Sequence, residues 1–308
     1  MVDFYRELPK AELHLHLEGS VEPATLAELA PELSPEEIQS IYQFSGFLGF
    51  LQAFTRVVER LQTPSDYALI TQHMIERMEA QNVRYAEVTL SAGVVFWKKQ
   101  EFGPVFDAIR DAAHGSAVEV RWILDTVRHF GVEPAMRVAE IAAQYAGDGV
   151  VAFSIGGDEA RGPASWFGEV YRFARGKGLR LTAHAGESMG PESVWAALEI
   201  GAERIGHGVR SIEDPVLVRH LRDHQIPLEV CITSNVVTGV VGGLREHPVR
   251  KLYEAGVPIV FNTDDPGFFG TTLCKEYELA EKEFGFSRQE LQEIAQNGFR
   301  YAFRSPGL

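Results

Sequence analysis

Two histidines near the start of the chain have a spacing that suits a shared metal ion. His14 and His16 alternate with Leu13, Leu15 and Leu17. In a β-strand, residues i and i+2 project to the same face, so both imidazoles would lie side by side. Buried ring nitrogens need partners. The run predicts one half of a metal site, although this pattern alone is equally typical of two hydrogen-bonded core histidines.

More groups of this kind follow at the ends of short apolar runs. His184 and Glu187 belong to His-Ala-Gly-Glu, His207 to Gly-His-Gly, and Asp264 and Asp265 to Asn-Thr-Asp-Asp-Pro. Three imidazoles and one carboxylate form a typical zinc ligand set, and zinc lowers the pKa of a bound water to about 7. The predicted ligands of one zinc ion per chain are His14, His16, His184 and Asp264. Glu187 and His207 then remain as acid and base groups, and Asp265 as a substrate anchor.

The elements that would position these groups alternate regularly along the chain. Eight apolar runs predict strands, and each is followed by at least one amphipathic stretch that predicts a helix. The predicted strands are 14–16, 83–90, 118–127, 150–155, 179–184, 204–207, 227–232 and 258–262. Such alternation indicates an α/β fold with a parallel sheet, and eight units indicate a closed (β/α)8 TIM-type barrel with its site at the C-terminal strand ends. An open doubly wound sheet is the alternative, but no Gly-x-Gly-x-x-Gly follows the first strand.

The long gap between the first two strands predicts an insertion. Residues 1–308 are expected to form a single metal-binding barrel domain, with approximately residues 21–80 as a helical cap on the face that carries the active site. Within it, an apolar stripe over 44–54 is rich in phenylalanine. Core packing is the favoured interpretation of this stripe, and a lid over a flat or greasy substrate is the alternative.

Composition excludes several classes of partner. The chain has 308 residues, 45% of them hydrophobic, and a formal net charge of −14 without a cluster of basic residues, so nucleic acid is not expected as a partner. Its two cysteines are far apart, and it shows neither a secretory signal nor a membrane-spanning run. We therefore expect a cytoplasmic protein that has no membrane partner and acts on a small molecule. No expectation for an oligomeric state follows.

Other zinc chemistries do not match the sequence. There is no His-Glu-x-x-His of the zinc proteases and no Pro-Cys-x-x-Cys of the cytidine-deaminase type. No lysine lies between Lys99 and Lys177, so the fourth strand offers none that could be carboxylated to bridge two metal ions. This favours a single zinc ion.

The motifs His-x-His-Leu-Glu-Gly, His-Ala-Gly-Glu, Gly-His-Gly and Asn-Thr-Asp-Asp-Pro, in this order, resemble the adenosine deaminase family of the amidohydrolase superfamily. The resemblance runs from Leu8 to about Phe303. It implies a barrel with one zinc ion and hydrolytic removal of the 6-amino group of a purine. It implies Glu187 as proton donor to the purine and His207 as the group that orients and deprotonates the nucleophilic water, with Asp264 as the third catalytic residue. The implied substrate-binding residues are His16, Glu18, Gly157 for N3 and Asp265 for N7.

The chemistry is consistent with those roles. Addition of water to C6 of an aromatic ring requires a proton on N1, so Glu187 must be protonated when substrate binds, and we predict that burial raises its pKa. Neutral N7 only accepts hydrogen bonds, so Asp265 must donate one. The paired glycines Gly156 and Gly157 would let the backbone approach the purine edge closely.

The expected substrate is adenosine or a 5′-modified adenosine, converted to the inosine-type product and ammonia. Glu18 stands where adenosine deaminases typically carry the Asp that contacts the ribose 5′-hydroxyl. A Glu also occurs in relatives that act on free adenine, but these tend to carry an acidic residue where this chain has Gly206. The alternatives are therefore aminodeoxyfutalosine, with its bulky 5′ substituent, and adenine. A non-catalytic purine-binding barrel and a zinc amidohydrolase of ring amides are answers of a different class.

Overall fold

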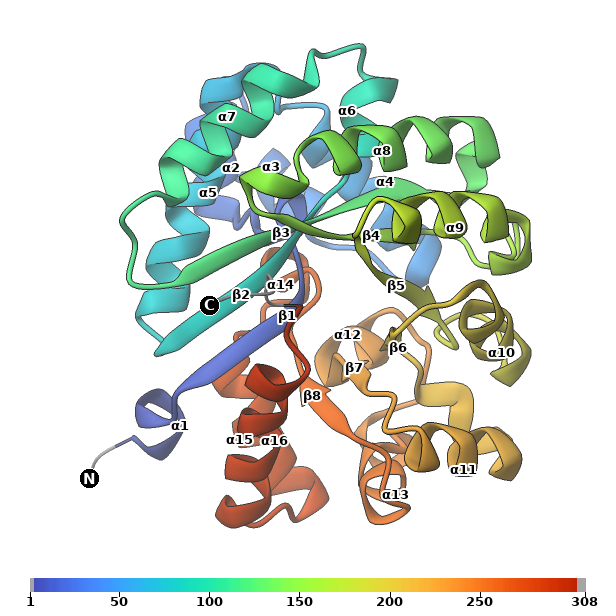
Figure 1. The fold of residues 1–308 in the computed structure, drawn as a ribbon. Coiled ribbons are helices and arrows are strands. Elements are labelled where there is room, and N and C mark those ends of the chain that lie inside the picture. Colours follow the sequence, from blue (N-terminus) through green and yellow to red (C-terminus); the bar gives the residue numbers. More distant parts are fainter. Residues whose placement is uncertain (1–2, 304–308) are drawn as a thin grey trace.

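A computed structural model describes residues 3–303 of the chain. Eight parallel strands follow one another around a nearly closed barrel, in chain order, and helices surround them (Figure 1). The strands are β1 (Lys10–His16), β2 (Val83–Leu90), β3 (Glu119–Val127), β4 (Val150–Gly156), β5 (Arg180–Ala185), β6 (Arg204–His207), β7 (Leu228–Val230) and β8 (Ile259–Phe261). The predicted (β/α)8 barrel and its eight strands are confirmed. Strand β7 ends earlier than predicted, because the chain turns at Cys231 into a short helix, α12 (Ile232–Val237).

The barrel closes between β1 and the segment that follows β8. The Asp264 N–H donates to the His14 carbonyl at 3.0 Å, and the His16 N–H donates to the Asp264 carbonyl at 2.9 Å. Two predicted ligands from the start of the chain and one from its end are thereby joined through their own backbone.

Amphipathic helices pack their apolar faces on the outside of the barrel. They are α5 (Pro64–Glu79), α7 (Phe102–Ala113), α8 (Val132–Gln144), α9 (Gly168–Gly176), α10 (Pro191–Ile200), α11 (Pro215–Asp223), α13 (Val249–Glu254), α15 (Leu273–Phe284) and α16 (Arg288–Arg300). Helix α1 (Phe4–Glu7) precedes the barrel, and the short helices α6 (Ala92–Trp97) and α14 (Pro266–Phe269) directly follow β2 and β8. These two short helices were not among the elements predicted from the sequence.

Three further helices lie between β1 and α5. They are α2 (Pro23–Leu29), α3 (Pro35–Ile41) and α4 (Gly46–Val58), preceded by a 3-10 turn at Glu18–Ser20. Helix α4 is held against α14, because the Phe50 ring lies 5.6 Å from the Phe268 ring and 5.0 Å from the Phe269 ring. Since α14 follows β8, this contact places α4 at the C-terminal end of the barrel.

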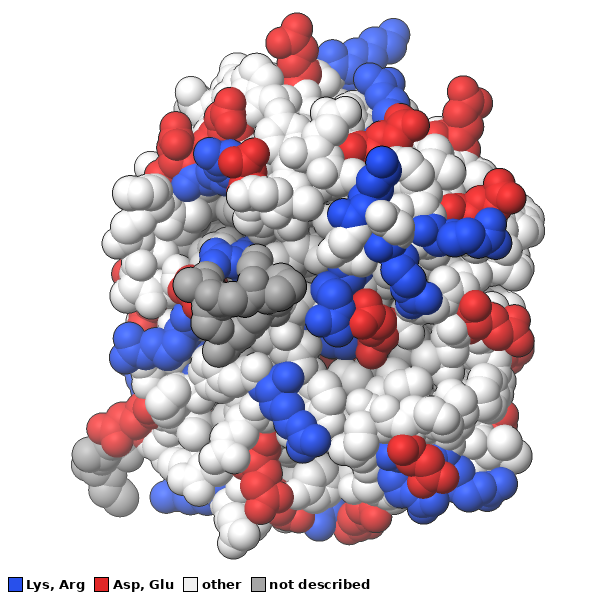
Figure 2. Space-filling model, in the orientation of Figure 1, with Lys and Arg blue, Asp and Glu red and all other residues white. Residues whose placement is uncertain are grey.

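The helices and one face of the surface were compared with what a membrane span requires. Within residues 3–303, none of the helices combines the length and apolar character needed to cross a bilayer. On the face drawn in Figure 2, basic and acidic side chains are interspersed.

Candidate active site

The four predicted metal ligands converge at the C-terminal ends of the strands. The His16 and His184 Nε2 atoms are 3.1 Å apart, and Asp264 Oδ1 lies 3.4 Å from Nε2 of both His14 and His16. One ligand atom from each of the four residues lies within 4.8 Å of all the others. The His14 Nε2 atom is buried without a hydrogen-bond partner. This donor set and its orphaned nitrogen fit a divalent metal ion.

Three of the four ligands are oriented by a second group on the side away from the cluster. Glu229 Oε2 lies 2.8 Å from His14 Nδ1, the Ile155 carbonyl lies 3.1 Å from His184 Nδ1, and the Ser234 hydroxyl donates to Asp264 Oδ2 at 2.7 Å. Such partners fix the tautomer and ring orientation of metal-binding histidines. Glu229 was not among the residues predicted from the sequence, because it lies within a strand and belongs to no recognisable motif.

The glycine at position 206 has a steric role next to the cluster. A Cβ on Gly206 would lie 2.6 Å from His14 Cε1, so a side chain here would displace this imidazole.

His207 and Glu187 lie beside the cluster. His207 Nε2 is 3.7 Å from Glu187 Oε1 and 3.8 Å from Asp264 Oδ2. On the opposite side of the ring, Nδ1 contacts the Asn235 amide at 3.1 Å, which in turn contacts His247 at 3.1 Å. Burial lowers the pKa of His207 to about 4, so the ring is neutral at pH 7.

Two of the converging residues have strained backbones. His207 and Asp264 have φ angles of 61° and 65°, in the left-handed region that residues other than glycine rarely adopt. Backbone hydrogen bonds to His14 and from His16 hold Asp264 there, and the Asn235 amide contacts the His207 ring, as is typical of side chains positioned for function.

Glu187 is held through its backbone by a second carboxylate, Glu159. Oxygens of Glu159 accept the N–H groups of Gly186 at 3.0 Å, Glu187 at 3.0 Å and Ser188 at 2.7 Å. Burial, with the nearby charges of Asp264 and Glu159, raises the pKa of Glu187 well above its ordinary value. The direction is the one predicted from the sequence, and it favours the protonated form of Glu187.

Asp265 and Gly157 border the same space. Asp265 Oδ1 is buried without a hydrogen-bond partner, and burial beside Asp264 raises the pKa of Asp265 well above its usual range. Gly19 leaves room for this carboxylate, because a Cβ there would lie 1.8 Å from Asp265 Oδ1. Gly157 has a φ of 88°, a conformation that suits glycine, and its backbone lines the cavity.

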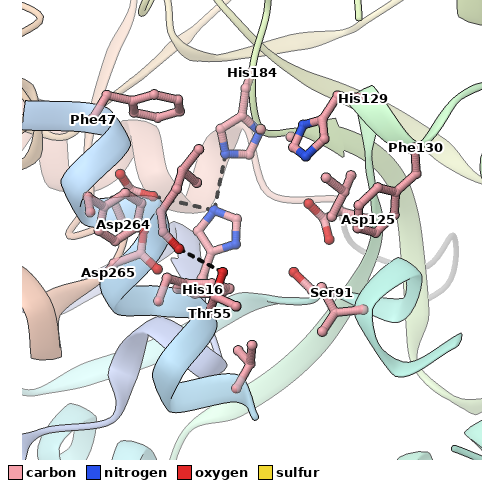
Figure 3. Close-up of a pocket in the computed structure, with 18 of the residues that line it drawn as sticks. His16, Phe47, Thr55, Ser91, Asp125, His129, Phe130, His184, Asp264 and Asp265 are labelled. Carbon is pink, nitrogen blue, oxygen red and sulfur yellow. Dashed lines mark hydrogen bonds and ion pairs between the residues drawn. The ribbon is translucent and has the colours of Figure 1, made fainter. Parts of the chain in front are cut away.

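A cavity of about 280 Å³ connects these groups with an aromatic wall (Figure 3). Helix α4 contributes Phe47, Phe50 and Phe54, while Trp97 and Phe130 are 52% and 37% exposed and mark the mouth. The expectation that favoured core packing for the 44–54 stripe is thus only partly right, since the stripe packs on α14 and also lines the cavity.

One predicted substrate contact lies outside the cavity, and two unpredicted polar residues lie on it. Glu18 is fully buried and absent from the cavity lining, and it accepts the Ser91 N–H at 3.1 Å. Ser91 and Asp125, at the ends of β2 and β3, line the cavity instead. The signal in the sequence that could have identified them was their place at the ends of two predicted strands.

Comparison with known proteins agrees with this geometry. The model of the adenosine deaminase family matches residues 9–306. The chain belongs to this family. It is 38% identical to an aminodeoxyfutalosine deaminase from Streptomyces coelicolor, over 97% of this chain and 81% of that protein. It is 37% identical to an adenine deaminase from Rhizobium leguminosarum bv. trifolii, over 96% of this chain and 95% of that protein.

A solved structure shows the same fold with a metal ion. The crystal structure of an amidohydrolase from Burkholderia ambifaria with bound Zn superposes with a TM-score of 0.91 at 29% identity, and covers 98% of this chain and 88% of that one. The chain is therefore a hydrolytic deaminase of the adenosine deaminase family, a class that acts on adenine-like substrates.

Proposed function

We propose that this chain deaminates a 6-aminopurine nucleoside, either adenosine or a 5′-modified adenosine, to the inosine-type product and ammonia, with one zinc ion bound. One observation carries the proposal. The cavity that contains the ligand cluster, Glu187 and Asp265 continues to an apolar aromatic wall that a bare purine ring has no need of.

Zinc is the metal we propose for the cluster. Three imidazoles and one carboxylate are its preferred ligands, and the Burkholderia relative was solved with Zn. When bound there, zinc would supply the Lewis acidity that makes water nucleophilic at neutral pH. The residues that would hold it are His14, His16, His184 and Asp264.

Glu187 is the proposed general acid. Its raised pKa keeps a proton that it can donate to purine N1, which removes electron density from C6 and prepares that carbon for attack. His207, neutral and held from behind by Asn235, would orient the attacking water and pass a proton to the leaving ammonia. The balanced result is one new C–O bond at C6 and one broken C–N bond.

Asp265 and Gly157 would hold the purine edge. A protonated Asp265 donates a hydrogen bond to N7, for which its buried, unpartnered Oδ1 is available. The Gly157 N–H would approach N3 without side-chain interference. We also propose residues 21–80 as the cap of a single domain, since side chains of α4 line the cavity.

Aminodeoxyfutalosine is the second candidate substrate. The exposed rings of Trp97 and Phe130 at the cavity mouth offer an apolar surface for its large 5′ substituent. Gly206, in contrast, favours a nucleoside over free adenine, because it lacks the acidic group expected of the adenine-specific relatives.

Ammonia release with zinc present tests the proposal. Adenine, adenosine, 5′-methylthioadenosine and aminodeoxyfutalosine are assayed in parallel, with Glu187→Gln as the inactive control and metal content measured for both proteins. Turnover of any nucleoside at a kcat/KM above about 10⁴ M⁻¹s⁻¹, well above that of adenine, supports it. Turnover of adenine alone assigns the chain to the adenine deaminases, and a zinc-loaded protein inactive on all four contradicts the deaminase mechanism.

A further inference from the structure

The proposed mechanism leaves one buried carboxylate in the cavity without a role. Asp125 is 3% exposed, lines the cavity, and its Oδ1 has no hydrogen-bond partner among the described residues. Ser91 is 5% exposed and lies next to it. In Figure 3 the oxygens of both side chains point into the cavity, on the opposite side of His16 from Asp264 and Asp265.

A structural role does not explain this carboxylate. A buried carboxyl group with an unsatisfied oxygen costs stability, so such a group in a cavity usually has a ligand to bind. The neighbouring strand leaves it room, because a Cβ on Gly156 would lie 2.8 Å from Asp125 Oδ2. Burial raises the pKa of Asp125 to about 7, which a hydrogen bond with the Ser91 side chain partly offsets. The group therefore gains a polar partner when a hydroxyl enters the cavity.

Glu18, the residue first expected to contact the sugar, is already engaged elsewhere. It is fully buried behind the cavity wall, and its carboxylate accepts the N–H of Ser91 at 3.1 Å. Its side chain therefore holds the turn between β2 and α6 and so positions the Ser91 hydroxyl.

We propose that Asp125 and Ser91 bind the 2′- and 3′-hydroxyls of the nucleoside substrate, and that Glu18 acts only by positioning Ser91. The inference rests on the proposed function, in which the 5′ carbon extends toward the aromatic wall and leaves the 2′,3′-diol as the polar part of the sugar. Two vicinal hydroxyls donate two hydrogen bonds, and a carboxylate beside a serine hydroxyl accepts them. Free adenine has no such groups, so this pair selects for nucleosides.

Steady-state kinetics with deoxy substrates tests the inference. The wild-type protein, Asp125→Asn and Ser91→Ala are assayed on adenosine, 5′-methylthioadenosine, the 2′-deoxy and 3′-deoxy forms of each, and adenine. Asp107→Asn is the matched control, since Asp107 is an exposed carboxylate on α7. Thermal unfolding and metal content are measured for every variant.

The expected result is a coupling between residue and hydroxyl. Removal of one ribose hydroxyl lowers the wild-type kcat/KM by about 10- to 100-fold, mainly through KM, as for a hydrogen bond to a charged group. Asp125→Asn lowers it by a similar factor on the parent nucleosides, but adds little further loss on the deoxy form that lacks its partner. A merely structural role would lower activity on every substrate alike.

Three outcomes would overturn the inference. If the wild-type protein turns over every deoxy form as fast as its parent nucleoside, the inference fails even if the variants do not fold. An Asp125→Asn loss that is the same with and without the hydroxyl also overturns it. In both cases nucleoside turnover itself, and hence the proposed function, survives. Turnover of adenine alone by the wild-type protein would instead refute the proposed function and the inference together.

Discussion

The two ends of the barrel interior bury charged groups to the same degree but pair them differently. Toward the N-terminal ends of the strands, the fully buried Arg204 contacts Glu87 at 2.5 Å and Glu229 at 2.6 Å. Its guanidinium carbon lies 3.6 Å from the Phe303 ring centre, and the Phe303 N–H donates to Glu87. At the C-terminal ends, Asp125 and Asp265 each retain an unpartnered oxygen.

The difference separates ionisable groups that are paired and stabilise the barrel from ionisable groups that remain available for a ligand. A buried charge is tolerated when a partner of opposite sign compensates its lost hydration, as around Arg204. Where such a partner is absent, the cost falls on the folded protein until a metal ion or a substrate binds. Glu229 belongs to both regions, because its two oxygens contact Arg204 and His14 respectively.

The largest expected effect is a loss of activity at the C-terminal ends of the strands. Glu187→Gln keeps the shape and hydrogen bonding of the side chain but removes the proton donor, so kcat should fall by about 10²- to 10⁴-fold. The exposed Glu192→Gln is the matched control and should leave kcat unchanged. Stopped-time ammonia assays measure the loss, and elemental analysis should find equal metal in all three proteins. A fall in metal content parallel to activity would instead assign Glu187 a structural role.

Removal of the Arg204 charge should destabilise the ion pairs toward the N-terminal ends of the strands. Arg204→Ala leaves Glu87 and Glu229 buried and uncompensated, so the free energy of unfolding should fall by about 3–5 kcal/mol. Urea denaturation of the metal-free protein measures it. Arg210→Ala, which breaks only an exposed pair with Glu213, should cost about 1 kcal/mol or less. Similar losses of unfolding free energy in both variants would contradict the stabilising role assigned to the buried Arg204 pairs.

The stability of the protein should also depend on pH through Asp125, at the C-terminal ends of the strands. Burial raises the pKa of Asp125 from 3.8 to about 7. Between these values the folded protein holds a proton that the unfolded chain has released, so the free energy of unfolding falls as pH rises from about 4 to 7. The contribution is at most about 4 kcal/mol and is absent in Asp125→Asn. Urea denaturation of both metal-free proteins at several pH values checks this, and parallel curves would refute it.

The smallest effect is expected where the two regions meet. Glu229→Gln keeps a hydrogen bond to His14 but weakens its orientation, so metal affinity should fall by about 10- to 100-fold. Competition with a chelator measures the affinity, and the exposed Glu254→Gln serves as control. An unchanged affinity would limit Glu229 to its pairing with Arg204.

The fold was predictable because its signals are local and repeated. Apolar runs of strand length, each followed by an amphipathic stretch, sufficed for eight strands in order. The short helices α6 and α14 were missed, because they follow strand ends directly and their apolar residues read equally well as core. The end of β7 was misplaced for the same reason, since Ile232 is apolar in either conformation.

The types of side chain that meet at the centre were predictable from the sequence. His14, His16, His184, Glu187, His207, Asp264 and Asp265 carry groups whose burial would be costly without a function, and they occur in motifs whose spacing is visible in one dimension. How far each group reaches the cavity depended on the tertiary fold. In the folded protein, Glu18 lies behind the cavity wall, Asp125 and Ser91 line the cavity, and Glu229 contacts His14. The physical reason is that such contacts depend on side-chain direction between strands distant in sequence, which no local pattern records.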